Sequence, residues 1–353
     1  MPEGGAMRTT TIGAYPKPDY VPLPDWFRAP QRTDTPDPTR GWAEARAAWG
    51  QRLEPLLDRA TVEVVREQVE LGIDIPTDGE IRRENYIHYH CRHIEGIDFA
   101  RLGEKVMRGH YTARLPTVVG PLRAGAPFLV RDWRIAQAAT DRPVKMTLPG
   151  PLTISDSVVD EHFGDAAALG RALAGVLNVE VRRLAAAGCR WIQVDEPLFA
   201  RRPAEALAFG IENLERCFHG LPAAVMRCVH ICCGYPRDVD MEDYPKAPAG
   251  NYLRLAPVLD AAAVDAVSIE DAHRRNGPEL LEAFAHKTVI LGVVDVARTR
   301  VETEEEIRDH LRAALEHIDA GRLIAAPDCG LGLLTRDQVR AKLAAMARAA
   351  HAL

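Results

Sequence analysis

The sequence predicts a (β/α)8 TIM barrel, an α/β fold in which eight parallel strands alternate with helices. Eight short apolar runs bounded by turn residues alternate with longer stretches of helical periodicity, and polar side chains follow nearly every run. The strands are expected at residues 8–12, 72–76, 144–148, 191–194, 223–229, 266–269, 288–293 and 323–326. No low-complexity tract or clean linker interrupts this alternation, so we expect a single catalytic domain over residues 1–353.

The segments between these runs have the apolar spacing of helices that pack on a sheet. Helices are expected at residues 60–71, 165–187, 203–217, 252–260, 303–320 and 335–351. In the fifth of these, Thr303 with Glu306 forms a capping box at the start, and Gly321 supplies a stop at the end.

Two connections are too long to be simple strand-to-helix loops. The first, residues 13–41, is rich in proline and is expected to run extended across the mouth of the barrel. The second, residues 78–133, follows the second strand and contains a candidate hairpin between Phe99 and Phe128. We expect this insertion to form a lid over the same end of the barrel.

The composition favours a small-molecule enzyme. A formal net charge of −6 and an isoelectric point near 6.1 provide no basic surface for nucleic acid and no polybasic patch for a membrane. Residues 1–7 lack the apolar core of a secretory signal, and no apolar stretch approaches the length of a membrane span. Seven cysteines, an odd number in a large chain, fit a reducing compartment. We therefore expect a cytoplasmic protein.

Metal-binding residue types follow three of the predicted strands. His230 and Cys232 end the fifth apolar run, Glu270 ends the sixth, and Cys329 follows the eighth. Residues two apart in a strand project to the same side, which favours Cys232 over Cys233 as the partner of His230. Together these nitrogen, sulfur and oxygen donors suit Zn²⁺, although each residue could instead have a separate structural role.

Two acids follow other strands and need a different role. Asp195 and Glu80 could neutralise an ammonium group in a confined site, where charge-assisted hydrogen bonds are strongest. They could instead cap helices or pair with arginines such as Arg82, Arg83 and Arg201. Asp328, next to Cys329, is a candidate for orienting the metal ligands.

This series of motifs resembles the catalytic domain of cobalamin-independent methionine synthase. The resemblance spans most of the chain, and it rests on residues 9–13, Gly79-Glu80 with Arg83, 148–153, 192–197, 230–232, 268–270 and 327–330. It implies that zinc is held by His230, Cys232, Glu270 and Cys329. It also implies that an amino acid substrate lies against Ile12, Gly13, Glu80 and Asp195.

The departures from the family concern the methyl donor. Alanine at position 14 replaces a serine, residues 154–157 replace a segment with a stacking tryptophan, and Ala297 replaces a histidine that serves the departing folate. The chain also has room for only one of the two barrels of the full-length enzymes. The methyl acceptor site is therefore better retained than the donor site, and the donor could be a corrinoid, with or without its carrier protein, methylfolate or another activated methyl compound.

These observations predict a zinc-dependent thiol methyltransferase that converts homocysteine to methionine, with Glu80 and Asp195 as its catalytic acids. A related alternative is a zinc enzyme that opens epoxides with coenzyme M or another small thiol. Coenzyme M carries a sulfonate, which Arg82 and Arg83 would suit better than the acids. A third alternative is a metal-free barrel of the uroporphyrinogen decarboxylase type that binds an anionic ligand.

Overall fold

The computed structural model describes residues 6–27, 39–107 and 111–353. Its centre is a parallel sheet with the strand order β1-β10-β9-β8-β7-β6-β4. These strands are β1 (Arg8–Thr9), β4 (Lys145–Pro149), β6 (Trp191–Asp195), β7 (Met226–Ile231), β8 (Ala266–Ile269), β9 (Thr288–Val294) and β10 (Leu323–Pro327). Each coincides with a predicted strand to within a few residues, and the predicted barrel fold is confirmed.

The predicted second strand, at residues 72–76, is the exception. This segment forms only two isolated parallel bridges, from Thr10 to Ile75 and from Thr77 to Lys145, and these bridges place it between β1 and β4. The buried side chain of Gln68 makes hydrogen bonds that a strand would otherwise make. Its amide nitrogen donates to the Thr77 carbonyl at 2.9 Å, and its oxygen accepts from the Thr77 N–H at 3.1 Å.

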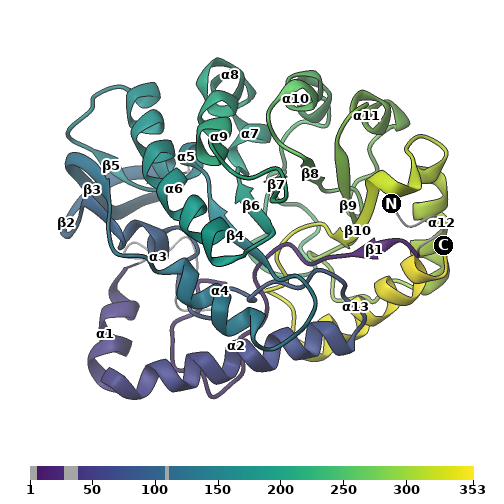
Figure 1. The fold of residues 1–353 in the computed structure, drawn as a ribbon, viewed down its shortest axis with the longest axis horizontal. Helices are drawn as coiled ribbons and strands as arrows, with labels where there is room; N and C mark the ends of the chain where they lie inside the picture. The colour runs from purple at the N-terminus through teal and green to yellow at the C-terminus, as the bar shows by residue number, and fades with distance from the viewer. Residues whose placement is uncertain (1–5, 28–38, 108–110) are drawn as a thin grey trace.

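Helices surround the sheet (Figure 1), and most of them contribute buried apolar residues to the main core cluster. The main ones are α1 (Arg40–Trp49), α2 (Leu53–Glu70), α6 (Ala166–Ala187), α9 (Ile211–Phe218), α10 (Gly250–Ala261), α11 (Pro278–Ala283), α12 (Glu304–Leu315) and α13 (Arg336–His351). In α6, Leu169, Leu173 and Leu177 repeat every four residues and are buried, which is the pattern of a helix packed on a sheet.

Two helix predictions need correction. The predicted helix at 203–217 is divided into α8 (Pro203–Glu205), a π-helical turn η2 (Ala206–Gly210) and α9. The capping box of Thr303 and Glu306 is confirmed, but α12 ends at Leu315. The N–H groups of His317 and Ile318 both bond to the Ala314 carbonyl, so the chain turns there and buries Ile318. The prediction that Gly321 stops this helix was wrong, since Gly321 lies in the later 3-10 turn η3 (Ala320–Arg322).

The insertion after the second strand position contains the expected hairpin. It begins with α3 (His88–Cys91), continues through the antiparallel strands β2 (Ile94–Met107) and β3 (Tyr111–Ala124), and ends at α4 (Leu129–Gln137). The hairpin starts five residues before the predicted Phe99. A short strand, β5 (Val159–Asp160), joins β3 in parallel, so the three strands form a separate sheet beside α5 (Pro151–Asp156) and α6 (Figure 1).

The proline-rich connection is described only in part. Residues 13–27 contain neither helix nor strand, as expected of an extended segment, and Tyr15 and Leu23 within it are buried. Residues 28–38 lie outside the described residues, and α1 begins shortly after them. Among the described helices, none is both long enough and apolar enough to span a membrane.

Candidate active site

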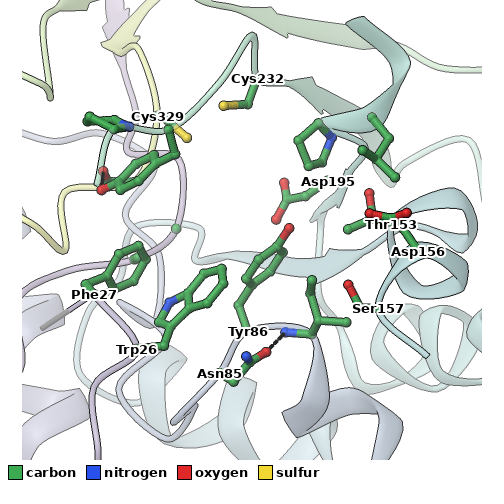
Figure 2. Close-up of a pocket in the computed structure, with 18 of the residues that line it drawn as sticks. Trp26, Phe27, Asn85, Tyr86, Thr153, Asp156, Ser157, Asp195, Cys232 and Cys329 are labelled. Atoms are coloured by element: carbon green, nitrogen blue, oxygen red, sulfur yellow. Dashed lines mark hydrogen bonds between the residues drawn. The ribbon is translucent and has the colours of Figure 1, made fainter. Parts of the chain in front are cut away.

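A cavity of about 460 Å³ opens at the carboxyl ends of the barrel strands. In a barrel of this kind, active sites are built from the residues that follow the strands. Seven of the predicted site residues line the cavity: Ile12, Gly13, Glu80, Asp195, His230, Cys232 and Cys329. Several of them are visible in Figure 2, where Cys232 and Cys329 lie on one side and Asp195 on another.

A sulfur and imidazole cluster forms one side of this cavity. Each of His230, Cys232 and Cys329 offers a donor atom, and these three atoms lie within 4.8 Å of one another. The Cys329 Sγ is 3.5 Å from the His230 Nε2. His230 and Cys232 come from the end of β7, and Cys329 follows β10, so residues 99 positions apart meet through the sheet.

Ser268 holds the imidazole of His230 in place. The register of β7 and β8 sets the two residues side by side, and the His230 Nδ1 lies 2.9 Å from the Ser268 Oγ. A histidine bound through one ring nitrogen to a polar neighbour keeps the other nitrogen for a metal or a proton. Here the Nε2 faces the two cysteines.

The two cysteines of the cluster are electrostatically coupled. The hydrogen bond from Cys329, together with His230, lowers the pKa of Cys232 well below its usual value. The same hydrogen bond and burial raise the pKa of the Cys329 thiol. The two thiols therefore titrate as a coupled pair, in which loss of the first proton is favoured and loss of the second is opposed.

Glu270 lies next to the cluster but not among its three donor residues. Its Oε2 accepts a hydrogen bond from the Lys246 Nζ at 2.8 Å, and the carboxylate is almost completely buried. Burial, followed by the nearby Cys232, raises the pKa of Glu270 well above its usual value. That Glu270 is a metal ligand stays a prediction.

Asp328 organises the chain on two sides of the cluster. Its Oδ1 accepts hydrogen bonds from the N–H groups of Asp271 and Ala272, each at 2.8 Å, and its Oδ2 accepts from the N–H of His273 at 2.9 Å. Because Asp328 directly precedes Cys329, these hydrogen bonds connect the loop that follows Glu270 to the chain segment that carries Cys329. This geometry supports its predicted role in orienting the cluster.

Glu80 is held in an unusual backbone conformation. Its φ of 55° lies in the left-handed region, which costs a residue other than glycine about 1–2 kcal/mol. Its Oε1 accepts from the Thr147 hydroxyl at 2.9 Å and from Arg83 at 3.1 Å. A Cβ at Gly13 would stand only 2.5 Å from this oxygen, so glycine at position 13 allows the carboxylate its place.

Asp195 extends the acidic side of the cavity. Its Oδ1 accepts from the Gln193 Nε2 at 2.7 Å, and the same nitrogen donates to the Ile12 carbonyl at 2.8 Å. The pKa of Asp195 is raised to about 7, mainly by burial and also by the charge of Glu80, while His230 acts in the opposite direction. Two buried acids that share a cavity wall form a site suited to a cation.

The arginines that could have favoured a sulfonate are already paired. Arg82 forms ion pairs with Glu54, Asp58 and Asp132. Arg83 contacts Glu80, Asp78 at 3.6 Å and the Thr147 carbonyl at 2.9 Å. Neither arginine lines the cavity, so this pair provides no anion site there.

Several residues of the site were not predicted from the sequence. They are the supporting residues Ser268, Gln193, Thr147 and Lys246, and the aromatic residues Trp26, Phe27, Tyr86 and Tyr235 on the cavity wall. A signal existed for Ser268, since it lies two positions before Glu270 on a strand adjacent to that of His230. The aromatic residues come from the two long connections and the loop after β7, where strand periodicity provides no guide.

Comparison with known proteins decides the family. Residues 7–352 match the family model described as cobalamin-independent synthase, catalytic domain. The chain belongs to the cobalamin-independent methionine synthase family. This confirms the resemblance of the motifs, and it makes the protein a methyltransferase of methionine biosynthesis by family.

Relatives from archaea and bacteria cover nearly the whole chain. The methionine synthase of Sulfolobus acidocaldarius is 29% identical over 341 residues, which cover 96% of this chain and 90% of the relative. That of Saccharolobus solfataricus is 30% identical over 342 residues, covering 96% and 92%. The solved structure of a B12-independent methionine synthase from Shewanella sp. W3-18-1, in complex with selenomethionine, has a TM-score of 0.84 and 32% identity and covers 98% of this chain and 97% of its own.

Proposed function

We propose that this methionine synthase relative transfers a methyl group to the thiol of homocysteine at His230, Cys232 and Cys329. The observation that carries this proposal is that one cavity contains both a sulfur and imidazole cluster and a pair of buried acids. Homocysteine has a thiol for the first and an ammonium group for the second. The Shewanella relative was solved with selenomethionine, an analogue of the methionine that such a reaction forms.

Zinc fits the donor set of the cluster. Zinc sites that take part in catalysis combine three protein ligands with an open position, and imidazole and thiolate are common ligands. Here Ser268 orients the imidazole, and the pKa of the Cys232 thiol is lowered well below its usual value. Zinc bound there would lower the pKa of the substrate thiol, so that the thiol reacts as a thiolate at neutral pH.

Glu270 is the proposed fourth ligand. Its buried carboxylate lies beside Cys232 and needs a cation to offset the cost of burial, as any buried charge does. Lys246 supplies one such cation at 2.8 Å. Glu270 would hold zinc together with the cluster, and Lys246 keeps its carboxylate paired.

The acid pair positions the amino group of the substrate. Glu80 and Asp195 act together as the proposed ammonium site, with the main chain of Ile12 and Gly13 alongside. An ammonium group between the acids stabilises both carboxylates and brings the pKa of Asp195 back towards its ordinary value. Binding there fixes the direction in which the thiol points, which is a large part of what an enzyme contributes to a transfer reaction.

The insertion of residues 78–133 is the proposed lid of a single domain that spans residues 1–353. Its hairpin supplies Met107, Ala113 and Leu115 to the cavity wall, so part of it already covers the site. A lid that excludes water protects a reactive thiolate. All seven cysteines are free, and we therefore place the protein in the reducing cytoplasm.

The relatives limit the choice of methyl donor. The family model and the Shewanella structure are described as cobalamin-independent and B12-independent, so the expected corrinoid or corrinoid carrier protein gains no support. Of the donors named above, methylfolate and other activated methyl compounds remain, and methylfolate is the one that the family favours. Ala297 is buried and does not line the cavity, and its methyl side chain cannot donate a proton to a departing folate.

The proposal is tested by a matrix of thiols and electrophiles on zinc-loaded protein. Homocysteine and coenzyme M are each supplied with methylfolate, methylcobalamin or an alkyl epoxide, and thiol loss and products are followed by mass spectrometry. Methionine formed from homocysteine, with no consumption of coenzyme M, is the expected result. Alkylation of coenzyme M in place of homocysteine would show that the epoxide-opening alternative is correct.

A further inference from the structure

The loop between β7 and α10 carries a lysine whose charge lies close to the sulfur cluster. The Lys246 Nζ is 2.8 Å from the Glu270 Oε2 and 4.7 Å from the centre of the Tyr244 ring, and 16% of the lysine side chain is exposed. Neither Lys246 nor Glu270 lines the cavity, whose sulfur side is formed by Cys232 and Cys329 (Figure 2). Lys246 can therefore act on a substrate only through the groups that face the cavity.

Main-chain contacts hold this loop in place around Lys246. The Ala247 N–H donates a hydrogen bond to the Cys233 carbonyl at 2.8 Å. A Cβ at Gly234 would stand only 2.4 Å from the Pro245 carbonyl oxygen, so glycine at this position lets the end of the loop return beside its start. The main chain on both sides of Lys246 is therefore fixed relative to the end of β7.

Two other basic side chains near Glu270 have closer partners of their own. The Arg274 guanidinium donates to a main-chain carbonyl of the loop at 2.8 Å. The His273 Nδ1 is 3.4 Å from the Glu270 Oε2 but only 2.9 Å from the Asp328 Oδ2. Among the described residues, the shortest ion pair of Glu270 is the one with Lys246.

The formal charges of the zinc-loaded cluster balance only when Lys246 is counted. Cys232 and Cys329, as metal-bound thiolates, carry two negative charges, and Glu270 as a carboxylate carries the third. His230 binds a metal in its neutral form. With two positive charges from zinc and one from Lys246, the site is neutral. A substrate thiolate therefore enters a neutral site, whereas without Lys246 it would enter a negative one.

Methyl transfer changes the charge of the substrate sulfur. The thiolate attacks the methyl carbon, a sulfur–carbon bond forms, and the electron pair of the bond that breaks stays with the rest of the donor. Homocysteine thus binds with an anionic sulfur and methionine with a neutral thioether, while their amino and carboxyl groups are the same. A cation near the cluster stabilises the first complex and has little effect on the second.

We propose, on the basis of the proposed methyltransferase function, that Lys246 is a positioning residue that makes the site prefer the thiolate of homocysteine to the thioether of methionine. Lys246 does this without touching either amino acid, because its charge acts through Glu270 and the sulfur cluster. The same preference favours release of the product once the sulfur has been methylated. A lysine that only held the loop in place would affect the binding of both amino acids alike.

Calorimetry on zinc-loaded protein compares the binding of reduced homocysteine with that of methionine. Lys246→Met should weaken homocysteine binding about tenfold and leave methionine binding nearly unchanged, because a charge is lost beside an anionic sulfur. Lys246→Gln, which can keep a hydrogen bond to Glu270 without the charge, should show the same loss, and Lys246→Arg should restore most of the preference. Lys105→Met is the matched control, since Lys105 bonds to two main-chain carbonyls and does not line the cavity.

Zinc affinity, measured by competition with a chromogenic chelator, supplies a second readout that needs no turnover. Removal of a cation beside Glu270 should leave zinc bound as tightly as in the wild type, or more tightly. Loss of zinc from both Lys246→Met and Lys246→Gln, or equal effects on homocysteine and methionine, would show that Lys246 only supports the structure, and would overturn the inference while leaving the proposed function standing. Zinc-loaded wild-type protein that does not bind homocysteine is the distinct result that refutes the proposed function.

Discussion

The two sides of the cavity differ in how they are built. The sulfur cluster and the acid pair come mainly from the ends of barrel strands or directly follow them, and hydrogen bonds from Ser268, Gln193 and Thr147 fix their side chains. The aromatic residues of the cavity wall come from the long connections and from the loop after β7. Strand ends thus supply the sulfur cluster and the acid pair, and loops supply the aromatic side chains of the same cavity. A barrel can keep one reaction at its strand ends while its loops change which molecule they bind.

The largest effect is expected at the sulfur cluster. Cys329→Ala removes one of three donors, so zinc retention and methyl transfer should both be lost, whereas Cys233→Ala, a matched change beside the cluster, should leave the zinc content intact. Metal analysis after dialysis, together with methionine formation, checks this. An active, zinc-free Cys329→Ala protein would show that the acceptor side works without the metal.

The acid pair should give a smaller effect with a distinct pH dependence. Burial raises the pKa of Asp195 to about 7, so below that pH the free protein holds a proton there. An ammonium group favours the carboxylate, and affinity should therefore rise as the pH increases through about 7. Asp195→Asn should weaken binding about 10–100-fold and flatten this dependence, because one charge-assisted hydrogen bond is lost.

Calorimetry with methionine, which has no titrating thiol, isolates this effect of Asp195. An unchanged pH dependence in Asp195→Asn would assign the titration to another group. Glu80→Gln is the companion variant, and it should weaken methionine binding without changing zinc content.

A supporting residue on the acceptor side should have a moderate effect. Ser268→Ala removes the hydrogen bond of 2.9 Å to the His230 Nδ1, and loss of such a partner lowers metal affinity about 10–100-fold. Competition with a chromogenic chelator measures this change. Zinc affinity equal to that of the wild type would mean that strand geometry alone orients His230.

The smallest effect is expected at the lid. Met107→Ala shortens a side chain of the hairpin that lines the cavity, and the KM for the methyl donor should rise about fivefold, as expected when roughly 1 kcal/mol of apolar contact is lost. The KM for homocysteine should stay within the error of steady-state kinetics. A change in the homocysteine KM alone would place the hairpin over the acceptor rather than the donor.

The sequence predicted the acceptor side because strand ends leave a regular pattern. An apolar run followed by His230, Asp195 or Cys329 indicates both the end of a strand and the residue that faces the site. Glu270 shows the limit of this reasoning. Its position after β8 was predicted, but its ion pair with Lys246 depends on a loop with no periodicity.

The aromatic residues of the cavity wall could not have been predicted by the same route. Trp26 and Tyr86 are 60 positions apart in two connections, and only the folded chain brings their rings to 4.8 Å. The end of α12 was missed for a related reason. Burial of Ile318 turns the chain before Gly321, and tertiary packing of this kind overrides a local stop signal.

The barrel closes between β1 and β4 through residues 72–77, and this part of the sheet should open more easily than the rest. Residues 72–77 are joined to their neighbours by two isolated bridges and otherwise largely by side chains, such as the Gln68 amide and the Thr9 and Thr10 hydroxyls, so this seam has fewer backbone hydrogen bonds than the paired strands of the sheet. Gly13 and Glu80 lie just beyond it, one on each side. An amino acid that contacts both Gly13 and Glu80 would link the two sides of this seam. Amide hydrogen exchange at residues 75–77 should then slow when the amino acid is bound.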